Sequence, residues 1–314
     1  MWYKVKIKPL SSILSDLSSD ILWGHLMWAI RYVISEDKLK QVIDDTKEGN
    51  GLFCSSLFPI FDGREFFPAL KLPAPKEKAE KHNIEVKELK KIRFVPQDII
   101  IDMKDSFSLD KYFNLLIGEL KSGLPTMFHQ EVRMRNVINR RSNTVQKGGL
   151  FSTRPMAFVG DMLYFFIHWP YEEKDLYSIL EFLSSSGYGA DKSVGLGHIE
   201  IDLNKDVEKL AEDFFDVDGA NAFIGLSLGI VEESEVDLSR SFYKIKSKIG
   251  RLGEAFANIE PYYKRPLWFM EEGSILCIKE RKKVYGKLEE NVHPNRDIVH
   301  YGITVPYKIK MEEF

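Results

Sequence analysis

The order of strand-like and helix-like segments is the feature that most restricts the fold of this chain. Residues 2–8 alternate apolar and charged side chains, which predicts a half-buried strand. An apolar stripe after the capping residues at 18–20 predicts a helix, and a second stripe over residues 173–185 predicts another. Apolar runs at 156–159 and 162–169 flank Gly160 and Asp161, which predicts a tight β-hairpin. Alternation over residues 199–203 predicts a last strand.

The resulting order, strand-helix-strand-strand-helix-strand, is that of a ferredoxin-like (RNA-recognition-type) α+β sandwich. The first and last strands of that fold are antiparallel neighbours, so we expect Lys4, Lys6 and Lys8 near Glu200 and Asp202. Residues 35–153 interrupt the unit and are too long for a loop, so we expect an insertion with structure of its own.

A second unit follows the first. We place the first domain at residues 1–204 and a second, degenerate ferredoxin-like domain at residues 205–314. In the second domain we expect strands near residues 223–231, 274–279 and 298–305, and a basic helix at residues 239–253.

The charge of the chain is small in total but segregated along the sequence. The net charge of −3 argues against a general nucleic-acid binder. However, residues 121–154 contain seven basic residues and one acidic residue, whereas acidic residues gather at 206–218 and 232–237. Such a chain can hold an anion on one face and a protein on another.

A glycine-rich loop at residues 187–197 is the first candidate binding site. Its glycines, with a lysine and a serine, suggest backbone N–H groups close to phosphates; the candidate residues are Gly187, Gly189, Lys192, Ser193, Gly195 and Gly197. The loop is not a Walker motif, because Asp191 precedes the lysine and because the loop runs from a helix into a strand. The alternative is a flexible turn that only closes the sandwich.

The second candidate is a basic segment that begins at residue 132, where arginine and asparagine alternate with apolar residues. An extended arm or hairpin would present these polar side chains on related faces, and arginine suits both RNA phosphates and splayed bases. The candidates from this pattern are Arg133, Arg135, Asn139 and Arg141. A solvated basic loop that binds another protein is the alternative.

One histidine could carry chemistry. His25 follows Gly24 on the first predicted helix and could act as a general base on an RNA 2′-hydroxyl, although a lone histidine is more often packed or hydrogen-bonded. No catalytic motif and no histidine or cysteine spacing typical of a metal site occurs, so we expect no catalytic residue, no metal and no cofactor. Two distant cysteines, no signal-peptide pattern and no membrane-spanning run predict a cytoplasmic protein without membrane contact.

Several short motifs together resemble the RAMP superfamily of CRISPR proteins, in particular the Cas-five-like group that supplies the fourth subunit of type III-A Csm effector complexes. The resemblance spans most of the chain and depends on the order of the motifs rather than on any single one. These motifs are residues 19–25 (SDILWGH), 55–59 (SSLFP), 67–73 (FPALKLP), 89–94 (LKKIRF), 136–140 (NVINR) ahead of 150–151 (LF), the loop 187–197, and 264–269 (KRPLWF) before 272–274 (EGS).

This resemblance implies two ferredoxin-like domains, the first with an inserted arm, and a subunit without catalytic activity. It implies that the glycine loop and the arm hold the repeat-derived 5′ handle of the guide RNA (crRNA). The first motif adds Ser19 and His25 to the candidate RNA-binding residues, and the motif at residues 136–140 adds Asn136 and Arg140. The implied partners are the crRNA 5′ handle, the large polymerase-like (Cas-ten type) subunit, a backbone RAMP subunit and, indirectly, target RNA.

Two other hypotheses remain open from the sequence. One is an endoribonuclease of the same superfamily that processes CRISPR repeat RNA, with His25 as general base. The other is a protein-binding scaffold, which the acidic patches favour.

Overall fold

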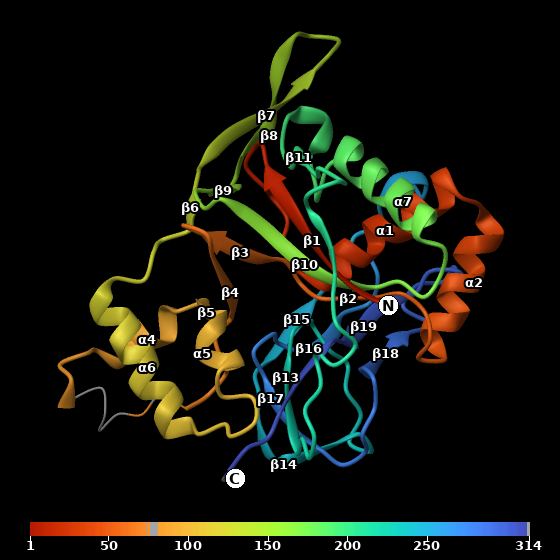
Figure 1. Ribbon diagram of the computed structural model, residues 1–314. Coiled ribbons are helices and arrows are strands. Elements are labelled where there is room, and N and C mark those ends of the chain that lie inside the picture. The colour runs from red at the N-terminus through yellow and green to blue at the C-terminus, as the bar shows by residue number, and fades with distance from the viewer. Residues whose placement is uncertain (74, 76–80, 313–314) are drawn as a thin grey trace.

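The computed structural model describes residues 1–73, 75 and 81–312, and Figure 1 shows the arrangement of their helices and strands. Within this part of the chain no helix is both long and apolar enough to cross a membrane. The helices are α1 (Ser19–Val33), α2 (Glu36–Lys47), α4 (Val86–Lys91), α5 (Gln97–Ile101), α6 (Leu109–Ser122) and α7 (Glu173–Ser186), with 3-10 helices η1 (Lys192–Val194) and η2 (Glu254–Phe256).

The largest sheet contains the predicted first and last strands as antiparallel neighbours, which confirms that expectation. Its order is β11-β1-β10-β3-β4-β5, with β12 paired to β1 and β2 paired to β10. The strands are β1 (Trp2–Pro9), β2 (Phe53–Cys54), β3 (Phe58–Phe61), β4 (Arg64–Pro68), β5 (Phe94–Pro96), β10 (Met162–His168), β11 (Ile199–Glu200) and β12 (Val207–Lys209). Lys8 lies opposite Glu200 in the register, whereas Lys4 pairs with Glu65 and Glu208 at 2.9 Å each.

Helices α1 and α7 lie together on one side of this sheet (Figure 1), where the two predicted apolar stripes meet. In α7 the side chains of Leu176, Ile179, Leu180 and Leu183 are all fully buried, as the stripe predicts. Burying four such side chains contributes several kcal/mol, at roughly 1.5–3 kcal/mol each.

The predicted hairpin at Gly160 and Asp161 is wrong. β9 (Met156–Phe158) pairs with β6 (Phe128–Gln130), and β10 pairs instead with β3, which lies about a hundred residues earlier in the chain. The backbone N–H of Asp161 donates to the carbonyl of Ile60 at 2.9 Å, so the chain enters β10 already paired to β3. The second strand of the predicted unit is therefore supplied by residues that were expected to belong to the insertion.

The rest of the insertion has structure of its own, as expected. Strands β4 and β5 extend the main sheet, and helices α4, α5 and α6 lie beyond that edge (Figure 1). Residues 128–158 leave the body through the β6–β9 pair and continue into a long hairpin of β7 (Arg133–Asn139) and β8 (Thr144–Thr153), which we call the arm.

The C-terminal half is a β structure. Strands form a four-stranded sheet in the order β14-β17-β13-β20 and the two-stranded pairs β15-β16 and β18-β19. They are β13 (Ala222–Gly225), β14 (Val236–Phe242), β15 (Ile245–Lys248), β16 (Leu267–Met270), β17 (Ile275–Ile278), β18 (Tyr285–Glu289), β19 (His300–Thr304) and β20 (Pro306–Ile309). The strands expected near residues 223, 274 and 298 are confirmed by β13, β17 and β19.

Two expectations for this half are not met. The predicted basic helix at residues 239–253 is wrong, because those residues form the end of β14 and all of β15. Among the described residues after 204 the only helical segment is η2, so the two α-helices of a second ferredoxin-like domain are not found there.

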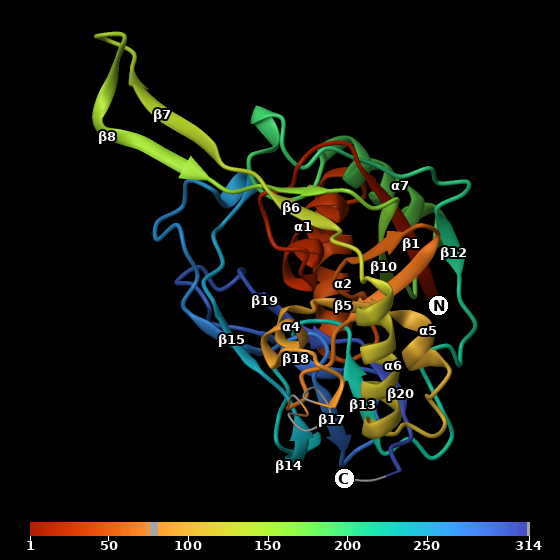
Figure 2. The same cartoon turned by 90° about the vertical axis from the view of Figure 1, so that its left-hand side faces the viewer.

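The two halves are joined by one apolar core. The main cluster of buried side chains includes residues of β1, α1, α7 and β10 together with Ile224, Ile303 and Tyr307 from the C-terminal half. At the junction, the backbone N–H of Cys54 donates to the hydroxyl of Tyr301 at 3.0 Å. Figure 2 shows the C-terminal strands below α1 and the arm leaving on the opposite end of the molecule. The domain division at residue 204 stays a prediction.

Candidate nucleic-acid interface

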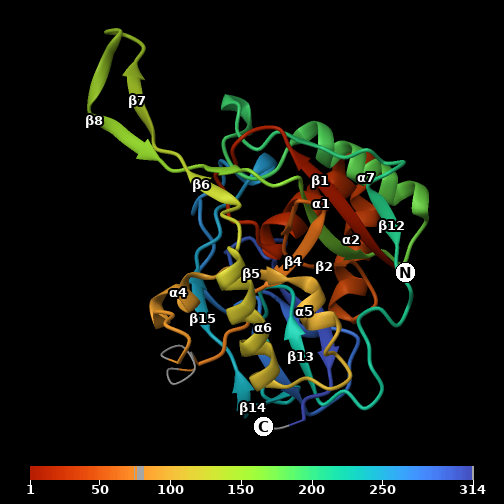
Figure 3. The same ribbon diagram turned by 60° about the vertical axis from the view of Figure 1, so that its left-hand side comes forward.

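The arm is an antiparallel hairpin that projects from the body of the protein (Figures 2 and 3). Strand β7 pairs with β8 from Arg133 opposite Thr153 to Asn139 opposite Thr144, with a register shift between Asn136 and Ile138. A two-stranded hairpin has little stability on its own. The base of the arm is therefore important, and there the β6–β9 pair and a β-bridge from Ile13 to Met156 attach it to the body.

The tip of the arm carries cations that have no ion-pair partner within the described part of the chain. Arg140 and Arg141 lie in the turn, and Lys147 lies on β8; all three are exposed. Asn139 stabilises the turn, because its Oδ1 accepts the backbone N–H of Arg141 at 2.9 Å. Exposed cations on a projecting hairpin are free to bind phosphates.

Large apolar side chains accompany these cations, which sequence reasoning did not single out. Met134 and Leu150 are each more than 60% exposed, and Phe151, opposite Arg135 in the register, is 45% exposed. Val132 and Ile138 are exposed as well. Apolar side chains on both faces of a hairpin are unfavourable in water and indicate a surface that a partner covers. The alternation of polar and apolar residues over 132–138 is the sequence pattern from which these exposed apolar side chains could have been predicted.

The glycine loop is closed at its neck by contacts that only glycine permits. Gly187 and Gly197 have φ of +81° and +67°, and the N–H of Tyr188 donates to the carbonyl of Gly197 at 2.8 Å. A Cβ on Gly197 would lie 1.9 Å from the carbonyl oxygen of Tyr188. Part of the glycine density is thus explained by loop closure, which was the alternative interpretation of this segment.

The remainder of the loop is fastened to the preceding segment and leaves only its tip free. Gly189 approaches Ser15 closely, and the Oγ of Ser15 accepts the N–H of Ala190 at 2.8 Å. The ammonium of Lys192 lies 3.0 Å from Glu254. Ser193 and Gly195 are exposed at the tip. The backbone of η1 therefore presents a short exposed surface that a phosphate could approach.

The arm and the glycine loop are brought together by one ion pair. Nη1 of Arg135, on β7, lies 2.5 Å from Oδ2 of Asp191 in the loop. Arg133, two residues earlier on the same face of β7, pairs with Glu131 at 2.8 Å and reaches Ser12 at 3.5 Å. Two of the predicted arginines thus hold the arm in place, whereas Arg140 and Arg141 remain available for a ligand.

Ser19 is not available to RNA in this structure. Its side chain is fully buried, and its Oγ accepts the backbone N–H of Leu228 at 3.2 Å. Its own N–H donates to the Oγ of Ser56 at 3.0 Å. Ser19 therefore joins α1 to the C-terminal half, and a role in RNA binding stays a prediction that its burial does not favour.

His25 is likewise part of the packing. Its Nε2 accepts the backbone N–H of Gly189 at 2.8 Å, and its ring lies against Tyr188, with centroids 5.4 Å apart. Burial, helped by the positive charge of Lys192, lowers the pKa of His25 to about 3. The nitrogen that a general base would use is already occupied and is a very weak base. In this geometry His25 holds the glycine loop in place through its contacts with Gly189 and Tyr188.

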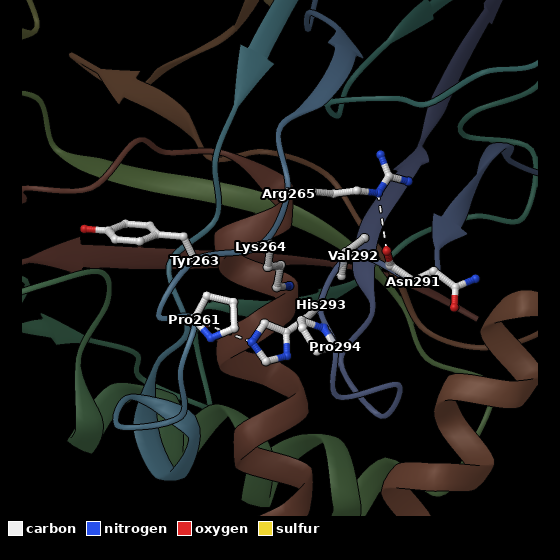
Figure 4. A pocket seen from close by; sticks show the side chains of 8 residues that line it. All are labelled: Pro261, Tyr263, Lys264, Arg265, Asn291, Val292, His293 and Pro294. Atoms are coloured by element: carbon white, nitrogen blue, oxygen red, sulfur yellow. Dashed lines mark hydrogen bonds between the residues drawn. The ribbon is translucent and has the colours of Figure 1, made fainter.

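A separate hollow of about 460 Å³ lies between the loop at residues 261–265 and the segment 291–294 (Figure 4). Its polar groups are satisfied internally: Nε2 of His293 donates to the carbonyl of Pro261 at 2.9 Å, and Lys264 donates to the carbonyl of Val299 at 2.7 Å. Burial lowers the pKa of Lys264 to about 8. Within the described residues no three His, Cys, Asp or Glu side chains gather as metal ligands would.

Comparison with known proteins gives a result only at the level of structure. No family model and no curated protein matches the sequence. Csm4 in a Csm1–Csm4 cassette complexed with AMPPNP superposes with a TM-score of 0.61 at 16% identity, covering 100% of this chain and 99% of that one. Csm4 in a Csm3–Csm4 subcomplex of the type III-A CRISPR-Cas interference complex superposes with a TM-score of 0.61 at 16% identity, covering 98% of each chain. The chain has the fold of Csm4.

The fold also resembles that of a chain from a second kind of complex. A chain of the type III-B Cmr-beta complex, bound to cognate target RNA and AMPPnP, gives a TM-score of 0.54 at 14% identity over 87% of this chain and 86% of that one. The Csm4 fold extends over the full length of the chain, so the insertion, the arm and the C-terminal β half all belong to it.

Proposed function

We propose that this chain is an RNA-binding subunit, without catalytic activity, of a type III CRISPR effector complex of the Csm kind. The Csm4 fold over the full length of the chain supports the assignment. We further propose that the chain holds the repeat-derived 5′ handle of the crRNA and docks the large polymerase-like subunit onto a backbone subunit. Complexes of Csm4 with Csm1 and with Csm3 support these two partners.

The junction of the arm and the glycine loop is the observation that carries the RNA-binding proposal. The Arg135–Asp191 pair joins the first strand of the arm to the glycine loop, so that the two predicted RNA-binding segments meet near the base of the arm. Proteins that bind single-stranded RNA combine cations with exposed aromatic side chains on which bases stack. The arm carries both, in the exposed Arg140 and Arg141 and in Phe151. Recognition of the handle, and of target RNA through it, is proposed on this basis.

Absence of catalysis is the second part of the proposal. An endoribonuclease would need a general base near the RNA, and His25, the candidate for that role, has its Nε2 bonded to Gly189. Incubation of the purified chain with a CRISPR repeat RNA tests this part. Intact RNA is expected, and cleavage that disappears in His25→Ala would overturn it.

Purification of the tagged chain from its native cell, with sequencing of any bound RNA, tests the main proposal. We expect short RNAs with one shared repeat-derived 5′ end, together with a large polymerase-like protein. A matched purification of the Arg140→Gln, Arg141→Gln double variant should recover less RNA. Recovery of the chain without RNA and without protein partners would contradict the proposal.

A further inference from the structure

A cationic pocket lies at the junction of the two halves, among β1, β10, β20 and the segments that precede β13 and β18. Its volume is about 480 Å³. Trp2, His168 and Phe215 form an aromatic floor, with the Trp2 ring 5.2 Å from that of His168 and 4.7 Å from that of Phe215. The basic side chains that line it are Arg281, Lys282, Lys283 and Lys308, and the acidic ones are Glu212 and Asp216.

Lys283 has an unusual partner for an ammonium group. Its Nζ lies 2.7 Å from Nε2 of His168, while Nδ1 of the same ring lies 2.8 Å from the carbonyl of Gly51. A carbonyl only accepts, so Nδ1 carries the proton and Nε2 accepts from the lysine. Lys283 is therefore bonded to a neutral ring, and no described carboxylate lies within ion-pair distance of it.

The neighbouring cations are only partly compensated. Asp216 serves both Arg281, at 2.7 Å, and Lys308, at 3.4 Å, while Lys282 pairs with Glu235 and Glu280, which do not line the pocket. The side chain of Lys308 is only 7% exposed. Burial lowers the pKa of Lys283 and of Lys308. Lys282 is compensated by carboxylates outside the pocket. The remaining cations of the lining, Arg281, Lys283 and Lys308, face only Glu212 and Asp216, and the N-terminal ammonium of Met1 lies 3.3 Å from Nε2 of His168. The pocket therefore keeps an excess of positive charge that a bound anion would relieve.

We propose that this pocket binds a phosphate group, with Lys283 and Lys308 as its principal ligands. A phosphate anion would relieve this positive charge, and two ammonium groups provide several N–H donors without the planar constraint of arginine. The aromatic floor excludes water from one side and strengthens the electrostatic interaction. This inference does not depend on the proposed RNA function.

Titration of the full chain with inorganic phosphate, at constant ionic strength with chloride as the balancing anion, tests the site. We expect phosphate to raise the unfolding temperature and to shift the ¹⁵N resonances of the His168 imidazole, since Lys283 bonds to that ring. The His168 resonance is measured on the unmodified protein, so the result does not depend on whether a variant folds. No shift of this resonance at saturating phosphate would overturn the proposal.

Substitution then assigns the ligands. Lys283→Gln should weaken phosphate binding at least tenfold. The control is Lys287→Gln, which removes an exposed lysine of nearby β18 that pairs with Glu232, and it should leave phosphate binding unchanged. Equal affinity in both variants would contradict the site. Competition with RNA trinucleotides distinguishes the possible ligands. If a 5′-phosphorylated trinucleotide displaces phosphate and its 5′-hydroxyl form does not, the natural ligand is a terminal phosphate of a nucleic acid. If neither displaces phosphate, the natural ligand is a small free anion.

Discussion

Nη1 of Arg135 on the arm lies 2.5 Å from Oδ2 of Asp191 in the glycine loop, and the two residues are 56 positions apart in the sequence. The pair fixes the direction in which the arm leaves the body. Its side chains are 24% and 35% exposed, so it contributes at most about 1 kcal/mol to the stability of the fold. Its effect is therefore on orientation rather than on folding.

Breaking this pair should loosen the arm without unfolding the protein. We expect Arg135→Gln and Asp191→Asn each to change the free energy of unfolding by less than about 1 kcal/mol, because the pair is partly exposed. Both should speed amide hydrogen exchange at the base of β7. Unchanged exchange in Asp191→Asn would show that the β6–β9 pair alone holds the arm.

The free arginines of the arm tip should control the salt dependence of RNA binding. Replacing Arg140 and Arg141 with glutamine should weaken binding of a handle RNA and reduce the slope of log K against log salt by about 1.4, if each contacts one phosphate of a single strand. Stability should not change, because both side chains are exposed. The control is Lys174→Gln with Lys205→Gln, two exposed lysines outside the arm, which should leave the slope unaltered.

Two glycines of the loop should respond very differently to alanine. Gly197→Ala places a Cβ against the carbonyl oxygen of Tyr188 and should cost more than about 2 kcal/mol of unfolding free energy, since the left-handed backbone adds about 1–2 kcal/mol to the clash. Gly195 has a similar φ, +86°, but no heavy atom lies within 4 Å of the position that a Cβ would take there. Gly195→Ala should therefore lower the unfolding free energy only by the cost of the left-handed backbone, about 1–2 kcal/mol. Chemical denaturation of both variants measures the difference. Equal costs would mean that the neck is not closed as described.

Local patterns in the sequence suffice for some elements of this fold. The helices α1 and α7 follow from periodicities within each segment, and the pairing of β1 with β11 follows from the order of the elements. The arm could be predicted from its alternation and its charge, although its contact with the glycine loop could not, because nothing in the sequence near residue 135 points to residue 191.

The two wrong elements have physical reasons. The hairpin at Gly160 fails because β10 finds a partner in β3, and a pairing between strands so far apart is not encoded by the turn between adjacent runs. The basic helix fails because Lys246 and Lys248 alternate with isoleucine and serine, which is a strand pattern. The side chain of Lys246 reaches Asp16, just before α1, and that of Lys248 reaches Asp20, in its first turn.

Stability should fall as the pH decreases from neutral, in part through His25. Its pKa is about 3 in the folded protein against about 6.5 when unfolded, so between these values the unfolded state binds the extra proton and acid favours unfolding. The contribution is up to about 1.4 kcal/mol per pH unit. Denaturation at pH 7, 6 and 5 should show a smaller loss in His25→Gln than in the parent chain. The exposed His198, replaced in the same way, serves as control and should leave the slope as it is.

A buried ion pair joins the C-terminal half to the first helix. Nζ of Lys248, on β15, lies 2.6 Å from Oδ1 of Asp20 in the first turn of α1, and the two side chains are 14% and 4% exposed. Burial alone would raise the pKa of Asp20, but His300, whose Nε2 lies 3.3 Å from Oδ2 of Asp20, and the charge of Lys248 outweigh it and hold that pKa well below its usual value. Asp20 is therefore a buried carboxylate that depends on its cation.

Lys248→Met should cost about 3–5 kcal/mol of unfolding free energy, because it leaves Asp20 charged and uncompensated in the interior. Two residues earlier on the same strand, Lys246 forms an equivalent contact with Asp16 at 2.8 Å, but those side chains are 40% and 52% exposed. Lys246→Met should cost no more than about 1 kcal/mol, since solvent screens that pair. Urea denaturation measures the unfolding free energy of both variants and so separates the effect of burial from that of charge. A similar loss in both would mean that Asp20 becomes protonated or hydrated when Lys248 is removed, and that the contact between β15 and α1 tolerates the change.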